Sequence, residues 1–151
     1  MSDDAPRLAL PPGVRERIVG LARAGTPNEV CGVFGGEFGP ETSRVTSVYP
    51  AENAAETPAT RYRIDPEEQL AIFERLEGRG EEIVGFYHSH PRGPPAPSAT
   101  DVEAAAWPDR SYVIVSLPAA GTAAEEPVPV VRSWRWRADR GEFERESVVS
   151  E

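Results

Sequence analysis

The chain contains only two histidines, His88 and His90, which stand on either side of one serine in the stretch GFYHSHPRGPPAPSATD. In a β-strand, residues i and i+2 point to the same face of the sheet, so this pair would present two imidazoles together. Neutral imidazole is a preferred ligand of Zn²⁺. The spacing therefore predicts a metal site, although two partly exposed histidines at a strand end would produce the same pattern.

The residues that follow His90 offer a third metal ligand. The prolines of PRGPPAP make a stiff loop, which leads to Ser98 and Asp101. Two interpretations of this Ser-x-x-Asp pattern stand side by side. It resembles a capping box that begins a helix with Ser98 as its N-cap. Equally, the Asp101 carboxylate would complete a set of three protein ligands, which leaves a fourth zinc position open for water.

A hydrolytic zinc site also needs a base that takes a proton from water. Glu29 is the candidate by context, because it begins the apolar stretch EVCGVFGG, where an acid facing solvent has no evident use. The alternative is a simple exposed residue at the start of a strand.

Taken together, these residues resemble the signature of the JAMM, or MPN-plus, zinc metallopeptidases. The matching positions are His88-Ser-His90-Pro, then Ser98 after seven intervening residues, and Asp101. Upstream, Glu29-Val-Cys-Gly resembles the glutamate that precedes a Cys-Gly pair in that family. The resemblance covers most of the chain. It is nearest to the stand-alone bacterial branch, which includes a peptidase that releases cysteine from a sulfur-carrier protein.

The resemblance implies a role for each of these residues. His88, His90 and Asp101 would bind one Zn²⁺, with water in the fourth position. Glu29 would act as general base and then as general acid, and Ser98 would stabilise the oxyanion by hydrogen bonding. The implied fold is the JAMM/MPN (cytidine-deaminase-like) fold, a curved, mostly antiparallel mixed sheet flanked by helices.

The resemblance also implies a protein partner. The substrate would be a ubiquitin-like or sulfur-carrier protein, cleaved after its C-terminal Gly-Gly. The leaving group stays open between cysteine, another amino acid and a lysine side chain, as does the oligomeric state. Arg61, Tyr62 and Arg63 could flank a substrate groove, but the sequence gives them no site role.

Charge and composition limit the other function classes. The net charge of −9 argues against nucleic-acid binding and so against a DNA-repair relative of this family. A zinc nucleobase deaminase needs a pair of cysteine ligands, whereas Cys31 is the only cysteine and is expected to be structural. A non-catalytic MPN scaffold remains the alternative, but such proteins typically lack a metal ligand. An acidic N-terminus and a single cysteine predict a cytoplasmic protein without a membrane span.

Periodicity and turn residues predict an α/β (α+β mixed) fold in a single domain over residues 1–151, with about 1–9 and the last few residues flexible. Asp65 is expected to cap a helix that begins with Pro66. The expected elements are a helix over 12–25, strands over 29–36 and 44–49, a helix from 65 to about 78, a strand over 82–90, a short helix over 98–107, a strand over 111–118, and a hairpin over 128–150 that turns at 138–142.

Overall fold

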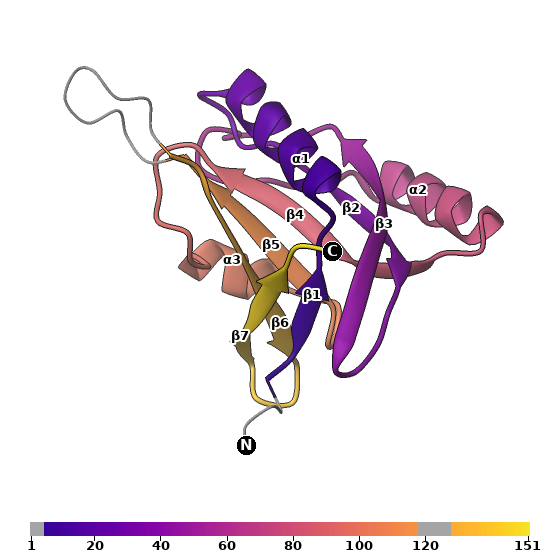
Figure 1. Ribbon diagram of the computed structural model, residues 1–151. Helices are drawn as coiled ribbons and strands as arrows, with labels where there is room; N and C mark the ends of the chain where they lie inside the picture. Colours follow the sequence, from indigo (N-terminus) through magenta and orange to yellow (C-terminus); the bar gives the residue numbers. More distant parts are fainter. Residues whose placement is uncertain (1–4, 118–127) are drawn as a thin grey trace.

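The computed structural model describes residues 5–117 and 128–151 (Figure 1). Along this part of the chain the elements are β1 (Arg7–Ala9), α1 (Pro12–Gly25), β2 (Cys31–Glu37), β3 (Thr42–Ala51), α2 (Pro66–Gly78), β4 (Glu82–His90), α3 (Ala99–Ala104), β5 (Ser111–Ser116), β6 (Val130–Arg137) and β7 (Glu142–Val149). None of the helices described is long and apolar enough to cross a membrane.

All the described strands belong to one sheet that closes on itself. Their order is β1-β3-β2-β4-β5-β6-β7, and the ring closes because β1 pairs with both β3 and β7. The pairs β2–β3, β2–β4, β5–β6 and β6–β7 are antiparallel, whereas β1–β3, β1–β7 and β4–β5 are parallel. The expected mixed sheet with flanking helices is therefore present, and its curvature goes as far as closure.

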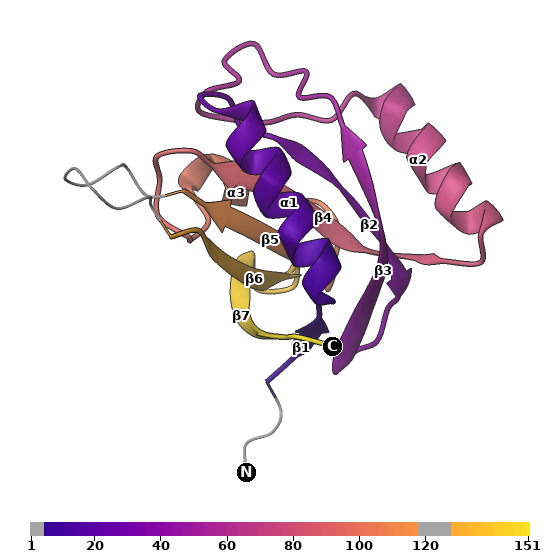
Figure 2. The same cartoon turned by 45° about the horizontal axis from the view of Figure 1, so that its top comes forward.

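Two apolar clusters form on the two faces of the sheet. Figures 1 and 2 show α1 lying across one face, with α2 and α3 away from it. On the α1 face, Ile18 and Ala22 of the helix join a cluster that includes Phe34 and Tyr87. On the opposite face, α2 contributes Ile72 and Leu76 to a largely aromatic cluster with Phe86, Tyr112 and Trp136. Adjacent buried residues of β4 thus alternate between the two clusters, with Tyr87 in the first and Phe86 in the second, as the pleat of a strand allows.

The local signals in the sequence predict most element boundaries closely. The side chain of Asp65 accepts hydrogen bonds from the backbone N–H groups of Glu67 and Glu68, so it caps α2 as expected. The helix α1 and the strand β4 have the predicted bounds. The helix α3 is shorter than predicted, since it ends at Ala104 rather than near residue 107. Residue 118, predicted to end the strand that begins at 111, lies outside the described residues.

Part of the segment expected to be flexible, about 1–9, is a strand in the structure. Arg7–Ala9 form β1, and Leu8 and Leu10 are buried in the α1-side cluster. A three-residue strand is too short to show a period, and its partners β3 and β7 lie far away in the sequence. Its position therefore depends on tertiary pairing that no local pattern encodes.

A fully buried ion pair joins the strands where the sheet closes. Arg135 of β6 and Glu146 of β7 both have side chains with no solvent exposure, and their Nε and Oε2 atoms are 2.7 Å apart. All five guanidinium N–H groups have acceptors; besides Glu146, these are the Ser43 hydroxyl and the backbone carbonyls of Arg7, Gly39 and Pro40. The Arg135 side chain of β6 thus forms hydrogen bonds with residues of β7, β1 and β3.

Replacement of Glu146 by alanine would leave the Arg135 guanidinium buried without a carboxylate. We expect this variant to lose about 3–5 kcal/mol of the free energy of unfolding in urea titrations, because an unpaired buried charge is strongly destabilising. The matched control is Glu151→Ala, which removes the surface partner of Arg44 and should cost less than about 1 kcal/mol. Equal losses in the two variants would show that the buried pair does not hold the sheet closed.

Candidate metal centre

The two histidines lie at the C-terminal end of β4, on the face of the sheet opposite α1. Phe86, His88 and His90 alternate along the strand with Tyr87 and Ser89, which face the other way. His88 is only 1% exposed, and His90 is buried as well. The two Nε2 atoms are 3.1 Å apart. The strand geometry expected from the sequence therefore brings both imidazoles to one point.

Asp101 reaches the same point from the first turn of α3. Its Oδ2 atom lies 3.2 Å from Nε2 of His88 and 3.1 Å from Nε2 of His90. The same oxygen accepts a hydrogen bond of 2.9 Å from the backbone N–H of Ser98. In return, the Ser98 hydroxyl oxygen accepts from the backbone N–H of Asp101 at 3.0 Å. The capping box is thus present, and it also orients the carboxylate toward the histidines.

A backbone carbonyl determines which nitrogen of His90 is free to bind a ligand. Nδ1 of His90 is 2.8 Å from the carbonyl oxygen of Pro94, in the proline-rich loop. A carbonyl only accepts hydrogen bonds, so Nδ1 carries the hydrogen, and the Nε2 atom of a neutral ring presents its lone pair to Asp101. This second contact on a histidine is the arrangement usual for metal ligands.

The charges at this point depend on one another. Burial by itself would raise the pKa of Asp101, but its close contacts with His88 and His90 and the hydrogen bond from the Ser98 N–H hold it well below its usual value. Burial lowers the pKa of His88, against the opposing effect of Asp101. Burial would also lower the pKa of His90, but its bonds to Asp101 and Pro94 reverse the direction and raise it. The site therefore combines a firmly ionised carboxylate with two buried imidazoles.

The three donor atoms fit a zinc ion. Ligands at 2.0–2.2 Å from a tetrahedral zinc are roughly 3.3–3.6 Å from one another. The observed separations of 3.1–3.2 Å between the two Nε2 atoms and Oδ2 of Asp101 are close to those values. Moreover, the lone pairs of His90 Nε2 and Asp101 Oδ2 face each other, which is favourable only with a proton or a cation between them.

Glu29 lies next to this triad because of the pairing of β2 with β4. Cys31 is the register partner of His88, so the antiparallel chain places Glu29 across from His90. Glu29 is 6% exposed, and its donor oxygen lies within 4.8 Å of the ligand nitrogens of both histidines. Within the described part of the chain, its Oε1 atom is buried without a hydrogen-bond partner. Asp101 is nearer to both histidines, at 3.1–3.2 Å, but Glu29 with the two histidines also forms a group of donor atoms that could hold a metal ion.

The ionisation of Glu29 is strongly perturbed. Burial raises its pKa from 4.5 to about 7; His90 lowers it and Asp101 raises it further, both by smaller amounts. Its backbone is fixed by two hydrogen bonds, from its N–H to the Pro58 carbonyl at 2.8 Å and to its carbonyl from the Asn53 amide at 3.0 Å. A carboxyl held in this way can exchange a proton near neutral pH.

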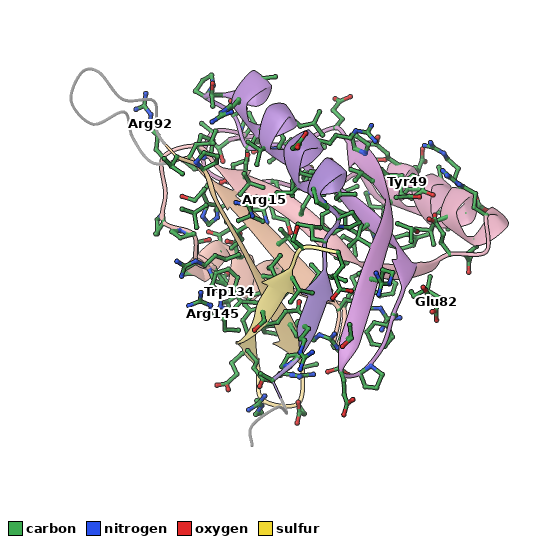
Figure 3. All side chains as sticks on the ribbon, viewed as in Figure 1. Arg15, Tyr49, Glu82, Arg92, Trp134 and Arg145 are labelled. Atoms are coloured by element: carbon green, nitrogen blue, oxygen red, sulfur yellow. The ribbon has the colours of Figure 1, made fainter. Side chains whose placement is uncertain are left out.

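A cavity of about 300 Å³ opens beside Glu29, His90 and Ser98, and it is otherwise lined by residues 59–60 and by the loop over 91–97. Ser98 is exposed to this cavity, and its hydroxyl hydrogen stays available because the oxygen only accepts in the capping box. Arg92 of the loop is exposed at the edge of the molecule (Figure 3). A substrate in the cavity would lie beside a carboxyl, an imidazole and a hydroxyl.

All five residues selected from the sequence therefore lie together in the structure: Glu29, His88, His90, Ser98 and Asp101. Cys31 is buried next to them, and burial raises its pKa to about 12, so the thiol stays protonated. Tyr62, which the sequence does not identify as a site residue, stacks its ring on His88. Its only sequence signal is an aromatic residue between two arginines, which does not identify a site.

Comparisons with known proteins show which proteins this chain is similar to. Residues 11–137 match the family model described as prokaryotic homologs of the JAB domain. The desampylase of Haloferax volcanii is 45% identical over 123 residues, which cover 79% of this chain and 87% of that protein. The CysO-cysteine peptidase of Mycobacterium tuberculosis is 37% identical over 129 residues, which cover 78% and 86%. A protein of Desulfitobacterium hafniense known from its solution structure has a TM-score of 0.81 and 33% identity, with 95% and 92% coverage.

Asp101→Asn tests the metal triad without removing the start of α3. The amide oxygen can still accept from the Ser98 N–H, but a neutral amide is a much weaker zinc ligand than a carboxylate. We expect wild-type protein to hold one zinc per chain in elemental analysis after dialysis, and the variant to hold much less. Glu103→Gln, in the same helix, is the control and should retain zinc. A variant that keeps wild-type zinc would exclude Asp101 as a ligand.

Glu29→Gln tests the buried carboxyl in the metal-free protein. Because the folded-state pKa is about 7 and the unfolded value about 4.5, the unfolded state loses its proton first as pH rises. Glu29 therefore costs stability progressively between these two pH values. The variant should be more stable than wild type above pH 7, with a difference that vanishes below pH 4.5, in urea titrations across this range. The exposed Glu56→Gln serves as control, and a pH-independent difference for Glu29→Gln would contradict the raised pKa.

Proposed function

The chain belongs to the prokaryotic JAB-domain family, within the JAMM-type hydrolases, and we propose that it is a zinc-dependent peptidase that cleaves ubiquitin-like or sulfur-carrier proteins after a C-terminal Gly-Gly. The observation that carries the proposal is the convergence of His88 Nε2, His90 Nε2 and Asp101 Oδ2 within 3.2 Å beside the Oε1 atom of Glu29, which has no hydrogen-bond partner among the described residues. Three protein ligands and an adjacent base are the parts of a hydrolytic zinc site.

In this proposal His88, His90 and Asp101 hold the metal. Bound there, Zn²⁺ would supply Lewis acidity that makes water nucleophilic at neutral pH and polarises the scissile carbonyl. The capping box keeps the Asp101 oxygen directed at the metal position, because the hydrogen bond from the Ser98 N–H to this oxygen would have to break before the carboxylate could turn away. The Pro94 carbonyl keeps the Nε2 atom of His90 free for the metal.

Glu29 is the proposed general base. It accepts a proton from the attacking water and then donates it to the leaving amine, so that the carboxyl returns to its starting state after each turnover. Burial favours this exchange because it raises the pKa of the carboxyl toward neutrality. The two backbone hydrogen bonds of Glu29 keep the side chain beside the histidines through both transfers.

Ser98 is the proposed oxyanion donor. Its hydroxyl oxygen is fixed by the Asp101 N–H, and its hydrogen can point into the cavity toward the carbonyl oxygen of a substrate. A fixed donor at the position where negative charge develops stabilises the transition state more than the ground state.

The names of two relatives support the proposed substrate class. One is a desampylase and the other a CysO-cysteine peptidase. Whether the leaving group here is cysteine or a lysine side chain is left to the experiment below. The single domain over residues 1–151, the cytidine-deaminase-like grouping of the fold and the cytoplasmic location stay predictions.

The proposed reaction is tested with two carrier-protein substrates and intact-mass analysis. One substrate carries a C-terminal cysteine after Gly-Gly and the other a lysine isopeptide. We expect the zinc-loaded protein to cleave after Gly-Gly, and Glu29→Gln to lower the rate by about 10²–10⁴-fold while it retains zinc, because only proton transfer is removed.

The control is Glu56→Gln, which should cleave at the wild-type rate. The preferred substrate identifies the leaving group. If the wild-type protein binds zinc but cleaves neither substrate, the proposed reaction is wrong, and a non-catalytic scaffold becomes the better account of the metal site.

A further inference from the structure

The His88 ring lacks the contact that usually orients a metal-binding histidine. Such histidines donate their second ring N–H to a carboxylate or carbonyl, which fixes the orientation of the ring. His90 follows this rule through Pro94. In His88, by contrast, Nδ1 is buried and has no hydrogen-bond partner among the described residues. In the part of the chain that the structure describes, no hydrogen bond at Nδ1 therefore orients this ring.

The ring of Tyr62 lies flat against the His88 ring. Their centroids are 4.4 Å apart and the planes are inclined by 22°, which is a stacked arrangement. The His90 ring meets His88 at a steep angle of 61°, with the centroids 4.9 Å apart. Rotation of the His88 ring would drive it into Tyr62, so stacking restricts the direction in which Nε2 points.

Tyr62 itself is held in place by Asn53. The Asn53 side chain donates to the carbonyl of Arg61 at 3.0 Å and accepts from the N–H of Arg63 at 3.1 Å, so it binds the residues on both sides of Tyr62. The same amide donates to the Glu29 carbonyl at 3.0 Å. One asparagine thus connects the segment that carries Tyr62 with the backbone of the proposed base.

We propose that Tyr62 is a positioning residue for the metal ligand His88, that its aromatic face replaces the missing hydrogen bond at Nδ1, and that Asn53 holds Tyr62 at the required distance. This inference rests on the metal site of the proposed function. Tyr62 does not touch the metal. It limits the rotation of His88, so that less freedom is lost when the metal binds.

Zinc affinity, measured by chelator competition, tests this role independently of catalysis. We expect Tyr62→Leu to weaken zinc binding about 10- to 100-fold, which is the usual effect of losing a contact that orients a ligand. Tyr62→Phe keeps the aromatic face and should bind zinc as wild type does. The visible spectrum of the cobalt-substituted protein, which reports ligand geometry, should change in the leucine variant alone.

The control is Tyr49→Leu, which removes a buried aromatic ring from β3 beside α2 (Figure 3). It should lower thermal stability without changing zinc affinity. Wild-type zinc affinity in Tyr62→Leu, or an equal loss in Tyr62→Phe, would overturn the inference. Failure of the wild-type protein to bind zinc would instead reject the metal site, so the two failures are distinguishable.

A double-mutant cycle tests the part assigned to Asn53. If Asn53 acts on the metal through Tyr62, Asn53→Ala should weaken zinc binding, and the double variant with Tyr62→Leu should lose no more than the larger single loss. Losses that multiply in the double variant would show that Asn53 affects the metal by another route.

Discussion

The candidate site depends on two reciprocal hydrogen bonds between Ser98 and Asp101, of 2.9 and 3.0 Å. Together they cap the N-terminus of α3. The bond from the Ser98 N–H also orients Oδ2 of Asp101 toward the two imidazoles of β4. A six-residue helix has little stability of its own, so the cap and the contacts of the first turn determine where it lies. The sequence allows two interpretations of Ser98 and Asp101, a cap of α3 or a metal-ligand position. In the folded protein the same pair of hydrogen bonds caps the helix and orients Asp101, the proposed ligand.

Buried charge has two different uses in this molecule. The Arg135–Glu146 pair is completely enclosed, and every N–H of the guanidinium has an acceptor, as expected of a group that holds strands together. At the metal centre, by contrast, buried atoms of Glu29 and His88 have no partner within the described residues. Native proteins rarely leave buried polar atoms unsatisfied, and at this centre the two such atoms belong to the proposed base and to a proposed metal ligand.

The connection from Asn53 makes the two halves of the site interdependent. Its amide holds the Glu29 carbonyl and the residues beside Tyr62, while Tyr62 restrains His88. Glu29, the proposed base, lies just before β2, whereas His88, a proposed metal ligand, lies on the neighbouring strand β4, and this irregular segment spans the two. Chemistry that requires a carboxyl within hydrogen-bond reach of water at a metal tolerates little relative movement of the two. A segment without regular secondary structure therefore contributes to the precision of the site.

The sequence by itself determined the features that depend on local geometry. His88 and His90 share a face because a strand has a period of two, Ser98 and Asp101 form a cap because their spacing matches the first turn of a helix, and Asp65 begins α2 for the same reason. Glu29 was singled out from the sequence, but its place across from His90 follows from the register of β2 against β4. Only the tertiary structure decided that register, the closure of the sheet through β1, and the position of Tyr62 on His88. These features depend on which distant segments meet, and the local pattern of each segment carries no information about its partner.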